Sequence, residues 1–118
     1  SLPGALEQIL TNLLMNSLIH GFDEGKRSGE IRITAQLQEQ HLRLLYTDNG
    51  RGIAAENLEK IFEPFFTTHR SHGGTGLGAY ICYNLITTQL KGNISCHSQP
   101  EQGVRFDINY PVALELTI

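Results

Sequence analysis

Four glycines lie within six residues, from Gly73 to Gly78, directly before an apolar stretch at helical spacing. Unpaired N–H groups at a helix N-terminus attract anions, and glycines let phosphate oxygens approach those groups closely. A P-loop is excluded, because Ala79 and Tyr80 follow where Lys and Ser or Thr are required. A dinucleotide fingerprint is also excluded, since the segment before the glycines contains Pro64 and no strand pattern. The glycines therefore indicate an anion site of another class or, alternatively, a surface loop that ends at a helix N-cap.

The stretch DNGRGI begins at Asp48, which is in phase with Leu44 and Tyr46 on the apolar face of a predicted strand. A carboxylate in that position is costly unless it is paired. It can accept a hydrogen bond from the exocyclic amine of adenine, while Gly50 and Gly52 let the backbone close around the ring. The alternative is a plain turn in which Asp48 bonds its own backbone.

A polar stripe follows one face of the first predicted helix, whose remaining surface is largely apolar. Its members are four residues apart: Gln8, Asn12, Asn16 and His20. A solvated face is the simplest explanation, but such a face usually carries Glu, Lys and Arg. Amide oxygens can also ligate Mg²⁺ together with phosphate oxygens and water, so Asn16 is a candidate metal ligand.

The segment IFEPFFTTHRSHGG, up to Gly74, crowds Phe62, Phe65 and Phe66 into a stretch without secondary-structure periodicity. These aromatic residues indicate docking onto a partner or a ligand, or else a loop folded onto its own core. The glycines that follow would let the segment swing, so we expect a lid that is mobile between Thr67 and Gly76 and becomes ordered over a bound nucleotide.

The remaining periodicities define the elements that must position these residues. They predict helices over 6–20, 54–61 and 77–90, and strands over 31–37, 42–48, 94–98 and 104–110. Each strand has one apolar and one polar face, which favours helices on one side of a mixed, mostly antiparallel sheet. We therefore predict an α+β fold, a two-layer α/β sandwich that forms a single domain over residues 1–118.

Composition excludes several classes of function. The 118 residues are 40% hydrophobic and carry a net charge of −3, so no broad basic face for nucleic acid is expected. No apolar run reaches the roughly 20 residues of a membrane span. Cys82 and Cys96 are isolated thiols without metal spacing, which favours a reduced, cytoplasmic setting. The helix pattern begins almost at Ser1, which suggests a domain excised from a larger protein.

Taken together, four stretches resemble the ATP-binding catalytic domain of sensor histidine kinases, within the gyrase, chaperone, histidine-kinase and mismatch-repair ATPase superfamily. NLLMNSLIH is similar to the N box, DNGRGI to the G1 box, IFEPFFTT to the F box and GGTGLG to the G2 box, in the family's order. GNISCHSQPEQGVRFDINYPV resembles the closing hairpin. The resemblance covers nearly the whole chain and implies a Bergerat-type fold that binds ATP and Mg²⁺.

The resemblance also implies roles for single residues. Asn16 would ligate Mg²⁺, with Asn12 supporting that site, and Asp48 would accept from the adenine amine beside Gly50, Gly52 and Ile53. Many family members have Lys or Arg where this chain has Ile19, so His20 is a candidate substitute for that phosphate contact. The expected phosphate-side residues are Arg70, Gly74, Thr75, Gly76, Leu77 and Gly78.

Position 12 separates the subfamilies. Relatives that hydrolyse ATP carry a water-activating Glu one turn before the metal Asn, whereas this chain has Asn12. The resemblance therefore implies phosphate transfer to a protein. None of the five histidines lies in the family's phosphoacceptor context, so the chain is not expected to phosphorylate itself.

The implied partners are a separate dimerisation and phosphoacceptor domain of the parent protein and, indirectly, a response-regulator receiver domain. No nucleic acid or membrane contact by this domain is expected, although the parent protein could be membrane-anchored. Two alternatives stay open at this point: a serine kinase of the anti-sigma-factor type, and a non-catalytic nucleotide-binding module of the same fold.

Overall fold

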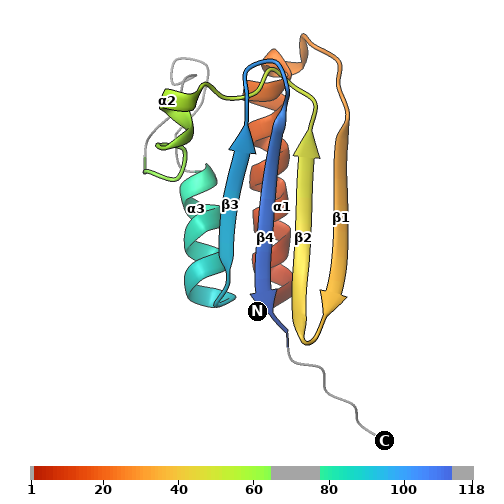
Figure 1. Ribbon diagram of the computed structural model, residues 1–118, viewed down its shortest axis with the longest axis vertical. Coiled ribbons are helices and arrows are strands. Elements are labelled where there is room, and N and C mark those ends of the chain that lie inside the picture. The colour runs from red at the N-terminus through yellow and green to blue at the C-terminus, as the bar shows by residue number, and fades with distance from the viewer. Residues whose placement is uncertain (1, 65–77, 113–118) are drawn as a thin grey trace, which may run out of the picture.

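The computed structural model describes residues 2–64 and 78–112 of the chain (Figure 1). Two of the helical elements, η1 and η4, are π-helical turns that continue the α-helices before them. The elements run in the order α1 (Leu2–Asn16), η1 (Ser17–Gly21), η2 (Asp23–Gly25), β1 (Ile31–Gln38), β2 (His41–Asp48), α2 (Ala55–Leu58), α3 (Gly78–Asn84), η4 (Leu85–Gln89), β3 (Asn93–Ser98) and β4 (Val104–Pro111).

The four strands form one sheet in the order β1-β2-β4-β3, and every neighbouring pair is antiparallel. No parallel pair occurs among the described strands, so the predicted mixed character is not found there. The central pairing places Asp48, the last residue of β2, between Ile31 of β1 and Val104 of β4. The sheet topology thus brings the DNGRGI stretch beside the closing hairpin.

A two-residue turn joins β1 to β2. Its residues, Glu39 and Gln40, both have positive φ angles, of 49° and 69°. Two positive φ angles are typical of a type I′ turn, whose twist matches that of the flanking strands. This turn could not be predicted from the sequence, since the usual Asn-Gly or Asp-Gly pair is replaced by Glu39 and Gln40.

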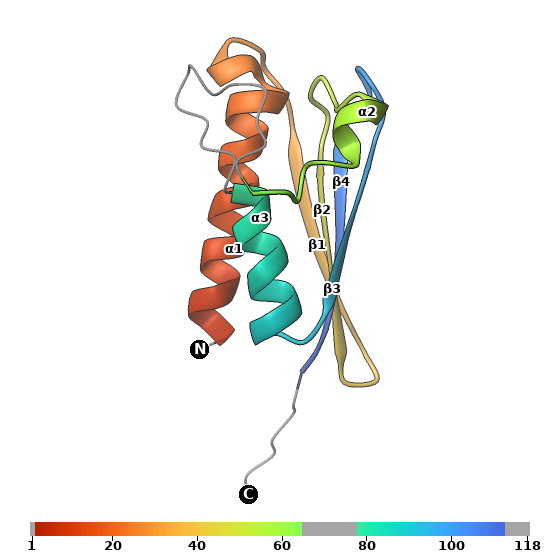
Figure 2. The same cartoon turned by 90° about the vertical axis from the view of Figure 1, so that its left-hand side faces the viewer.

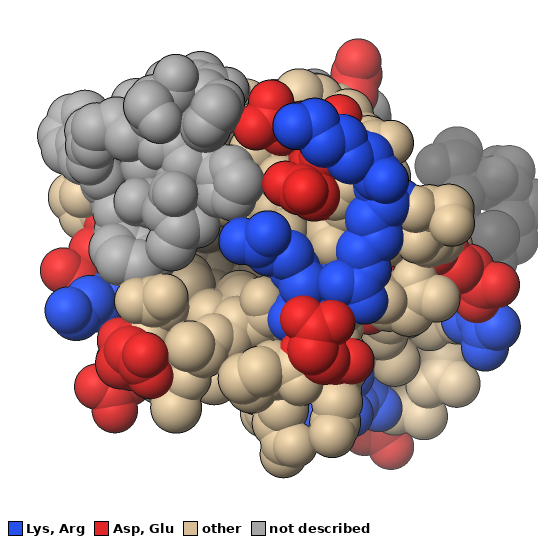
Figure 3. Space-filling view, turned by 90° about the horizontal axis from the view of Figure 1, so that it is seen from above, with Lys and Arg blue, Asp and Glu red and all other residues tan. Residues whose placement is uncertain are grey.

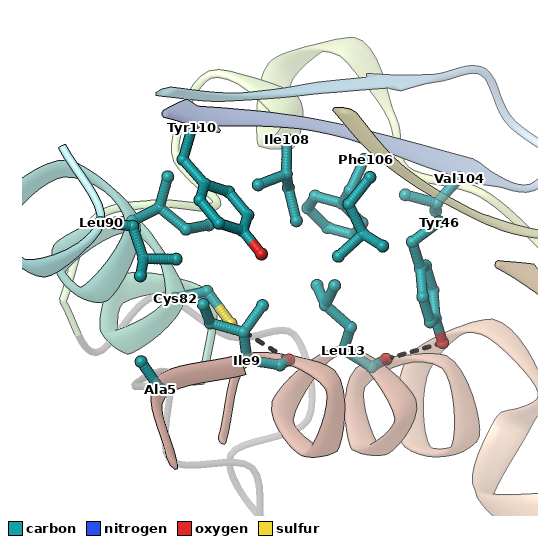
Figure 4. Close-up of a cluster of buried hydrophobic side chains, with 12 residues drawn as sticks. Ala5, Ile9, Leu13, Tyr46, Cys82, Leu90, Val104, Phe106, Ile108 and Tyr110 are labelled. Carbon is teal, nitrogen blue, oxygen red and sulfur yellow. Dashed lines mark hydrogen bonds between the residues drawn. The ribbon is translucent and has the colours of Figure 1, made fainter. Parts of the chain in front are cut away.

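The helices α1 and α3 pack side by side on one face of the sheet and leave the other face open (Figure 2). The buried side chains between the two layers come from α1, α3, η4 with the residue that follows it, and the strands β2 and β4 (Figure 4). They are Ala5, Ile9, Leu13, Leu44, Tyr46, Cys82, Ile86, Leu90, Val104, Phe106, Ile108 and Tyr110. This arrangement confirms the predicted two-layer α+β sandwich.

Strand β1 differs from the half-buried strand that its alternation predicts. Ile33 and Leu37 share the core face of the sheet with their partners Tyr46 and Leu42, yet they are 43% and 50% exposed. The cause is topological: β1 is an edge strand, and α1 lies behind β4 and β2 (Figure 1). An apolar face is buried only where a second layer covers it.

The helix bounds also differ from the predicted ones. The first helix begins at Leu2, and its last turn is a π-helix from Ser17 to Gly21. The short helix predicted over 54–61 ends at Leu58. The segment that follows begins with Phe62, whose ring contacts those of Tyr83 and Phe106 at centroid distances of 5.6 and 6.3 Å. Phe62 therefore packs on the core, whereas Phe65 and Phe66 lie outside the described residues.

None of the helices in the described part of the chain combines the length and the apolarity that a membrane crossing requires.

Candidate functional site

A cavity of about 270 Å³ opens where α1 and β2 end and β4 begins. Most of its walls are apolar or glycine, and one buried carboxylate, that of Asp48, lies among them. The lining residues are Asn16, Ser17, His20, Gly21, Asp48, Arg51, Gly52, Ile53, Ala54, Asn57, Ile61, Val104 and Phe106. Apolar walls with a few convergent polar groups are typical of a small-molecule site.

Charges of both signs surround this end of the molecule (Figure 3). Arg27 pairs with Glu101 at 3.1 Å, and Arg51 lies 3.9 Å from Asp23. These pairs are partly exposed, and such pairs contribute little to stability. The described surface around the cavity therefore carries charges of both signs.

Asp48 is only 8% exposed, and its carboxylate is held from two sides. The Ser17 hydroxyl donates to its Oδ2 at 2.7 Å, and the Gly50 N–H donates to its Oδ1 at 2.9 Å. The second contact is the turn bond that the sequence allows, so the turn and the buried acceptor are parts of one arrangement. Two donors make burial of the charge tolerable, and they leave acceptor capacity on the carboxylate that lines the cavity.

Ser17 and Tyr46 form a contact that sequence analysis missed. Ser17 Oγ lies 2.6 Å from the Tyr46 hydroxyl. That hydroxyl also donates to the Leu13 carbonyl oxygen at 3.0 Å (Figure 4). Burial raises the pKa of Tyr46 above its usual value; the Ser17 hydrogen bond opposes that rise and the nearby Asp48 charge adds to it. The net rise keeps Tyr46 protonated and able to donate. A small polar residue in phase with Leu13 was the available signal for Ser17.

Two glycines let the DNGRGI loop lie against the end of the first helix. A Cβ on Gly50 would stand 2.5 Å from the Gly21 carbonyl oxygen, and one on Gly21 would stand 3.2 Å from Asp48 Oδ2. The Arg51 N–H donates to that same carbonyl at 3.0 Å. Gly50 thus serves this backbone contact and is not among the cavity-lining residues.

Gly52 and Ile53 both line the cavity, as predicted. Gly52 has a φ of +74°, and a Cβ there would lie 2.1 Å from the Gln99 carbonyl oxygen. The Ile53 N–H donates to Ser98 Oγ at 2.8 Å. The turn between β3 and β4 therefore supports the wall that Ile53 presents to the cavity.

Asn16 lies where the N-terminus of α3 meets the end of α1. A Cβ on Gly78, the first residue of α3, would stand only 3.2 Å from Asn16 Oδ1, so the bare glycine lets the start of α3 approach the amide oxygen closely. The described residues contain no cluster of His, Cys, Asp or Glu that could hold a metal ion. The single amide oxygen of Asn16 is of a ligand type that fits an Mg²⁺ arriving with phosphate oxygens and water.

Asn12 does not line the cavity. Its Nδ2 is buried without a hydrogen-bond partner of ordinary geometry. The neighbouring Cys82 thiol donates to the Ile9 carbonyl oxygen at 3.6 Å, and burial raises the pKa of this thiol to about 12, a rise that contact with Asn12 opposes. Cys82 is therefore an unreactive core residue, and Asn12 carries the one buried side-chain donor in the described residues that lacks a partner.

Among the other predicted site residues, His20 lines the cavity and Ile19 does not. The expected lid and the phosphate-side residues before α3 lie outside the described residues: Arg70, Gly74, Thr75, Gly76 and Leu77. Cavity residues that sequence analysis missed, besides Ser17 and Gly21, are Arg51, Ala54, Asn57, Ile61, Val104 and Phe106. Most of these face the cavity only because distant segments meet there.

Comparisons with known proteins agree on one family. The family described as "Histidine kinase-, DNA gyrase B-, and HSP90-like ATPase" matches residues 2–114. The chain is 41% identical over 108 residues to the alginate biosynthesis sensor protein KinB of Pseudomonas aeruginosa, covering 91% of this chain and 17% of KinB. It is 37% identical over 110 residues to the sensor histidine kinase ZraS of Escherichia coli O157:H7, covering 93% of this chain and 22% of ZraS.

Solved structures give the same result. The nucleotide-free catalytic domain of the histidine kinase ThkA is 34% identical, with a TM-score of 0.74, and the match covers 92% of this chain and 67% of that one. Full-length ShkA in complex with AMPPNP is 28% identical, with a TM-score of 0.78, covering 97% of this chain and 23% of ShkA. The chain thus spans about a fifth of the length of the curated sensor proteins that it matches.

Proposed function

Since the chain belongs to the histidine kinase-, DNA gyrase B- and HSP90-like ATPase family, we propose that it is the Mg-ATP-binding catalytic domain of a sensor histidine kinase. Nucleotide binding follows from the family. The finer proposal is that the domain donates the γ-phosphate of ATP to a histidine on a separate dimerisation and phosphoacceptor domain. A receiver domain of a response regulator is the next acceptor, and the cytoplasm, where ATP is available, is the proposed location.

The observation that carries this proposal is the buried Asp48 carboxylate in the wall of the cavity. An ionised carboxylate only accepts hydrogen bonds, so its free capacity suits the exocyclic amine of adenine. The planar base would lie against Gly52 and Ile53, where no bulky side chain intervenes. Val104 and Phe106 supply apolar surface for the rest of the ring.

The phosphates would extend from the base toward Asn16 and the start of α3. This direction is supported by the close approach of Gly78, the first residue of α3, to Asn16 Oδ1. A bound Mg²⁺ would supply positive charge that offsets the charge developing during transfer. Asn16 would orient that group through its amide oxygen, and His20, on the same wall, is a further candidate phosphate contact.

Transfer is a better proposal than hydrolysis, because this chain has Asn12 at the position where the resemblance implies a water-activating Glu in relatives that hydrolyse ATP. Catalysis of phosphoryl transfer rests mainly on holding the acceptor in line with the γ-phosphate. The protein acceptor must then come from outside residues 1–118, which we propose form a single domain. The greater length of the matched sensor proteins is consistent with additional domains in the parent protein.

Labelling with [γ-³²P]ATP tests the proposal. The isolated chain should not label itself, whereas the dimerisation domain of the parent protein, added in trans, should become labelled. The label should be acid-labile, as phosphohistidine is. An acid-stable label would favour a serine kinase, and efficient labelling of the chain alone would contradict the proposed division between donor and acceptor.

A further inference from the structure

The Asp48 carboxylate is the last member of a hydrogen-bond network that links the first helix to the sheet. Its hydroxyl members, Ser17 and Tyr46, are 3% and 0% exposed. The network joins Ser17 to Tyr46 and to Asp48, which lie 29 and 31 positions later in the sequence. Tyr46 is not among the cavity-lining residues, whereas Ser17 and Asp48 both line the cavity.

The proton positions in this hydrogen-bond network follow from counting donors. An ionised carboxylate and a backbone carbonyl can only accept, and each hydroxyl has one proton. Because Ser17 spends its proton on Asp48, the contact between Ser17 and Tyr46 must use the proton of Tyr46. The Tyr46 hydroxyl therefore points between Ser17 Oγ and the Leu13 carbonyl oxygen, at 2.6 and 3.0 Å. The contact with Tyr46 thus fixes the orientation of the Ser17 hydroxyl, which is the donor that faces Asp48.

The backbone restricts Asp48 further. The Gly50 N–H holds Oδ1, while Gly21 leaves just enough room for Oδ2, since a Cβ there would approach it to 3.2 Å. The π-helical turn η1 begins at Ser17, and such turns often occur at functional sites. Ser17 is thus the side-chain donor that sets the rotation of the carboxylate at its Oδ2.

We propose that Ser17, oriented by Tyr46, is a positioning residue that aims the Asp48 carboxylate at the 6-amino group of a bound adenine. The inference rests on the proposed ATP site, but it assigns roles to Ser17 and Tyr46, which are not among the ligands expected from the four sequence boxes. Selectivity for a 6-aminopurine then depends on the arrangement of Asp48, Ser17 and Tyr46 together, and not on Asp48 alone.

The role of Ser17 differs from that of a packing residue in one measurable way. A packing defect at Ser17 would weaken every purine nucleotide alike. A positioning defect weakens only ligands that carry the amine, because Asp48 makes no bond to a base without it. Purine riboside 5′-triphosphate, which is ATP without the 6-amino group, separates the two cases.

The experiment measures the affinity of the chain for both nucleotides by calorimetry, with Mg²⁺ present. For Ser17→Ala we expect a loss of about tenfold for ATP and a change of less than about twofold for purine riboside triphosphate. For Tyr46→Phe we expect a smaller loss of about threefold, again confined to ATP. Ser95→Ala on the exposed β3 strand is the matched control and should change neither affinity.

Equal losses for the two nucleotides, or an unchanged ATP affinity in Ser17→Ala, would overturn the positioning role while leaving the ATP site intact. Tyr46→Phe gives an independent result if Ser17→Ala does not fold: a loss confined to ATP supports the role, and any other outcome contradicts it. If the unaltered chain binds neither nucleotide, the proposed function itself fails.

Discussion

The two sides of the cavity are built differently. On the side of Asp48, hydrogen bonds from Ser17 and Gly50 determine the position of the carboxylate before any ligand binds. On the side of α3, Asn16 faces a bare glycine, and the buried Nδ2 of Asn12, which does not line the cavity, has no hydrogen-bond partner of ordinary geometry among the described residues. In the proposed site the Asp48 side would receive the base and is pre-organised by the fold, whereas the Asn16 side would receive the phosphates. Pre-organisation lowers the cost of ordering a site on binding.

The largest test of this contrast is Asp48→Asn. Asparagine preserves the shape but can present an NH₂ group to the adenine amine, so the charge-assisted bond is lost. We expect ATP binding to weaken by about 1.5–3 kcal/mol, which is at least about tenfold in affinity. Calorimetry provides the measurement, and Asp107→Asn on the open face of the sheet is the control. An unchanged affinity in Asp48→Asn would remove Asp48 from the site.

Gly50→Ala tests whether backbone contact maintains the Asp48 side of the cavity. The added methyl group would meet the Gly21 carbonyl oxygen at 2.5 Å, and backbone cannot move aside as a side chain can. We expect the free energy of unfolding to fall by about 1–3 kcal/mol, measured by urea denaturation. Gly4→Ala, at an exposed position of α1, should instead stabilise the chain by up to about 1 kcal/mol. A neutral Gly50→Ala would show that the loop has room to shift.

Asn16→Ala should distinguish the Asn16 side of the cavity from the Asp48 side by the dependence of ATP affinity on Mg²⁺. If the amide oxygen ligates the metal ion, the variant should bind Mg-ATP about fivefold more weakly and lose less affinity for ATP in the presence of EDTA. Asn93→Ala, at an exposed position in β3, is the matched control. Equal losses with and without Mg²⁺ would show that Asn16 contacts the nucleotide and not the metal ion.

The smallest change in stability is expected for Asn12→Leu. Replacing a buried, unpaired donor by an apolar group of similar size is nearly neutral, so the free energy of unfolding should change by no more than about 0.5 kcal/mol. The affinity for Mg-ATP should nevertheless fall if Asn12 supports the metal site. A marked loss of stability, measured by urea denaturation, would show that this amide has a structural partner.

Periodicity was a good guide to the elements and to Asp48. Alternation along β2 already placed this carboxylate in phase with Leu44 and Tyr46, and all three are buried. The same alternation failed for β1, because it records which side chains share a face and not whether a helix covers that face. Ile33 and Leu37 are apolar and in phase, yet they remain about half exposed at the edge of the sheet.

The helix ends show a second limit. Spacing predicted helices through His20 and Leu90, but it could not distinguish α-helical from π-helical turns at 17–21 and 85–89. Those turns differ by one residue in the hydrogen-bonding interval, which a short apolar pattern does not resolve. The difference matters at Ser17, where the π-turn begins and the side chain reaches Asp48.

By itself, the sequence determined the two-layer α+β class, the order of the elements, the family, and Asp48 and Asn16 as residues to test. These depend on local spacing and on motifs that lie within a few residues of one another. Only the tertiary structure decided that Ser17 and Tyr46 hold Asp48, that Gly21 meets Gly50, and that β1 is left uncovered. Those contacts join segments about 30 residues apart, and the packing of α1 on the sheet, not any local pattern, selects which side chains meet.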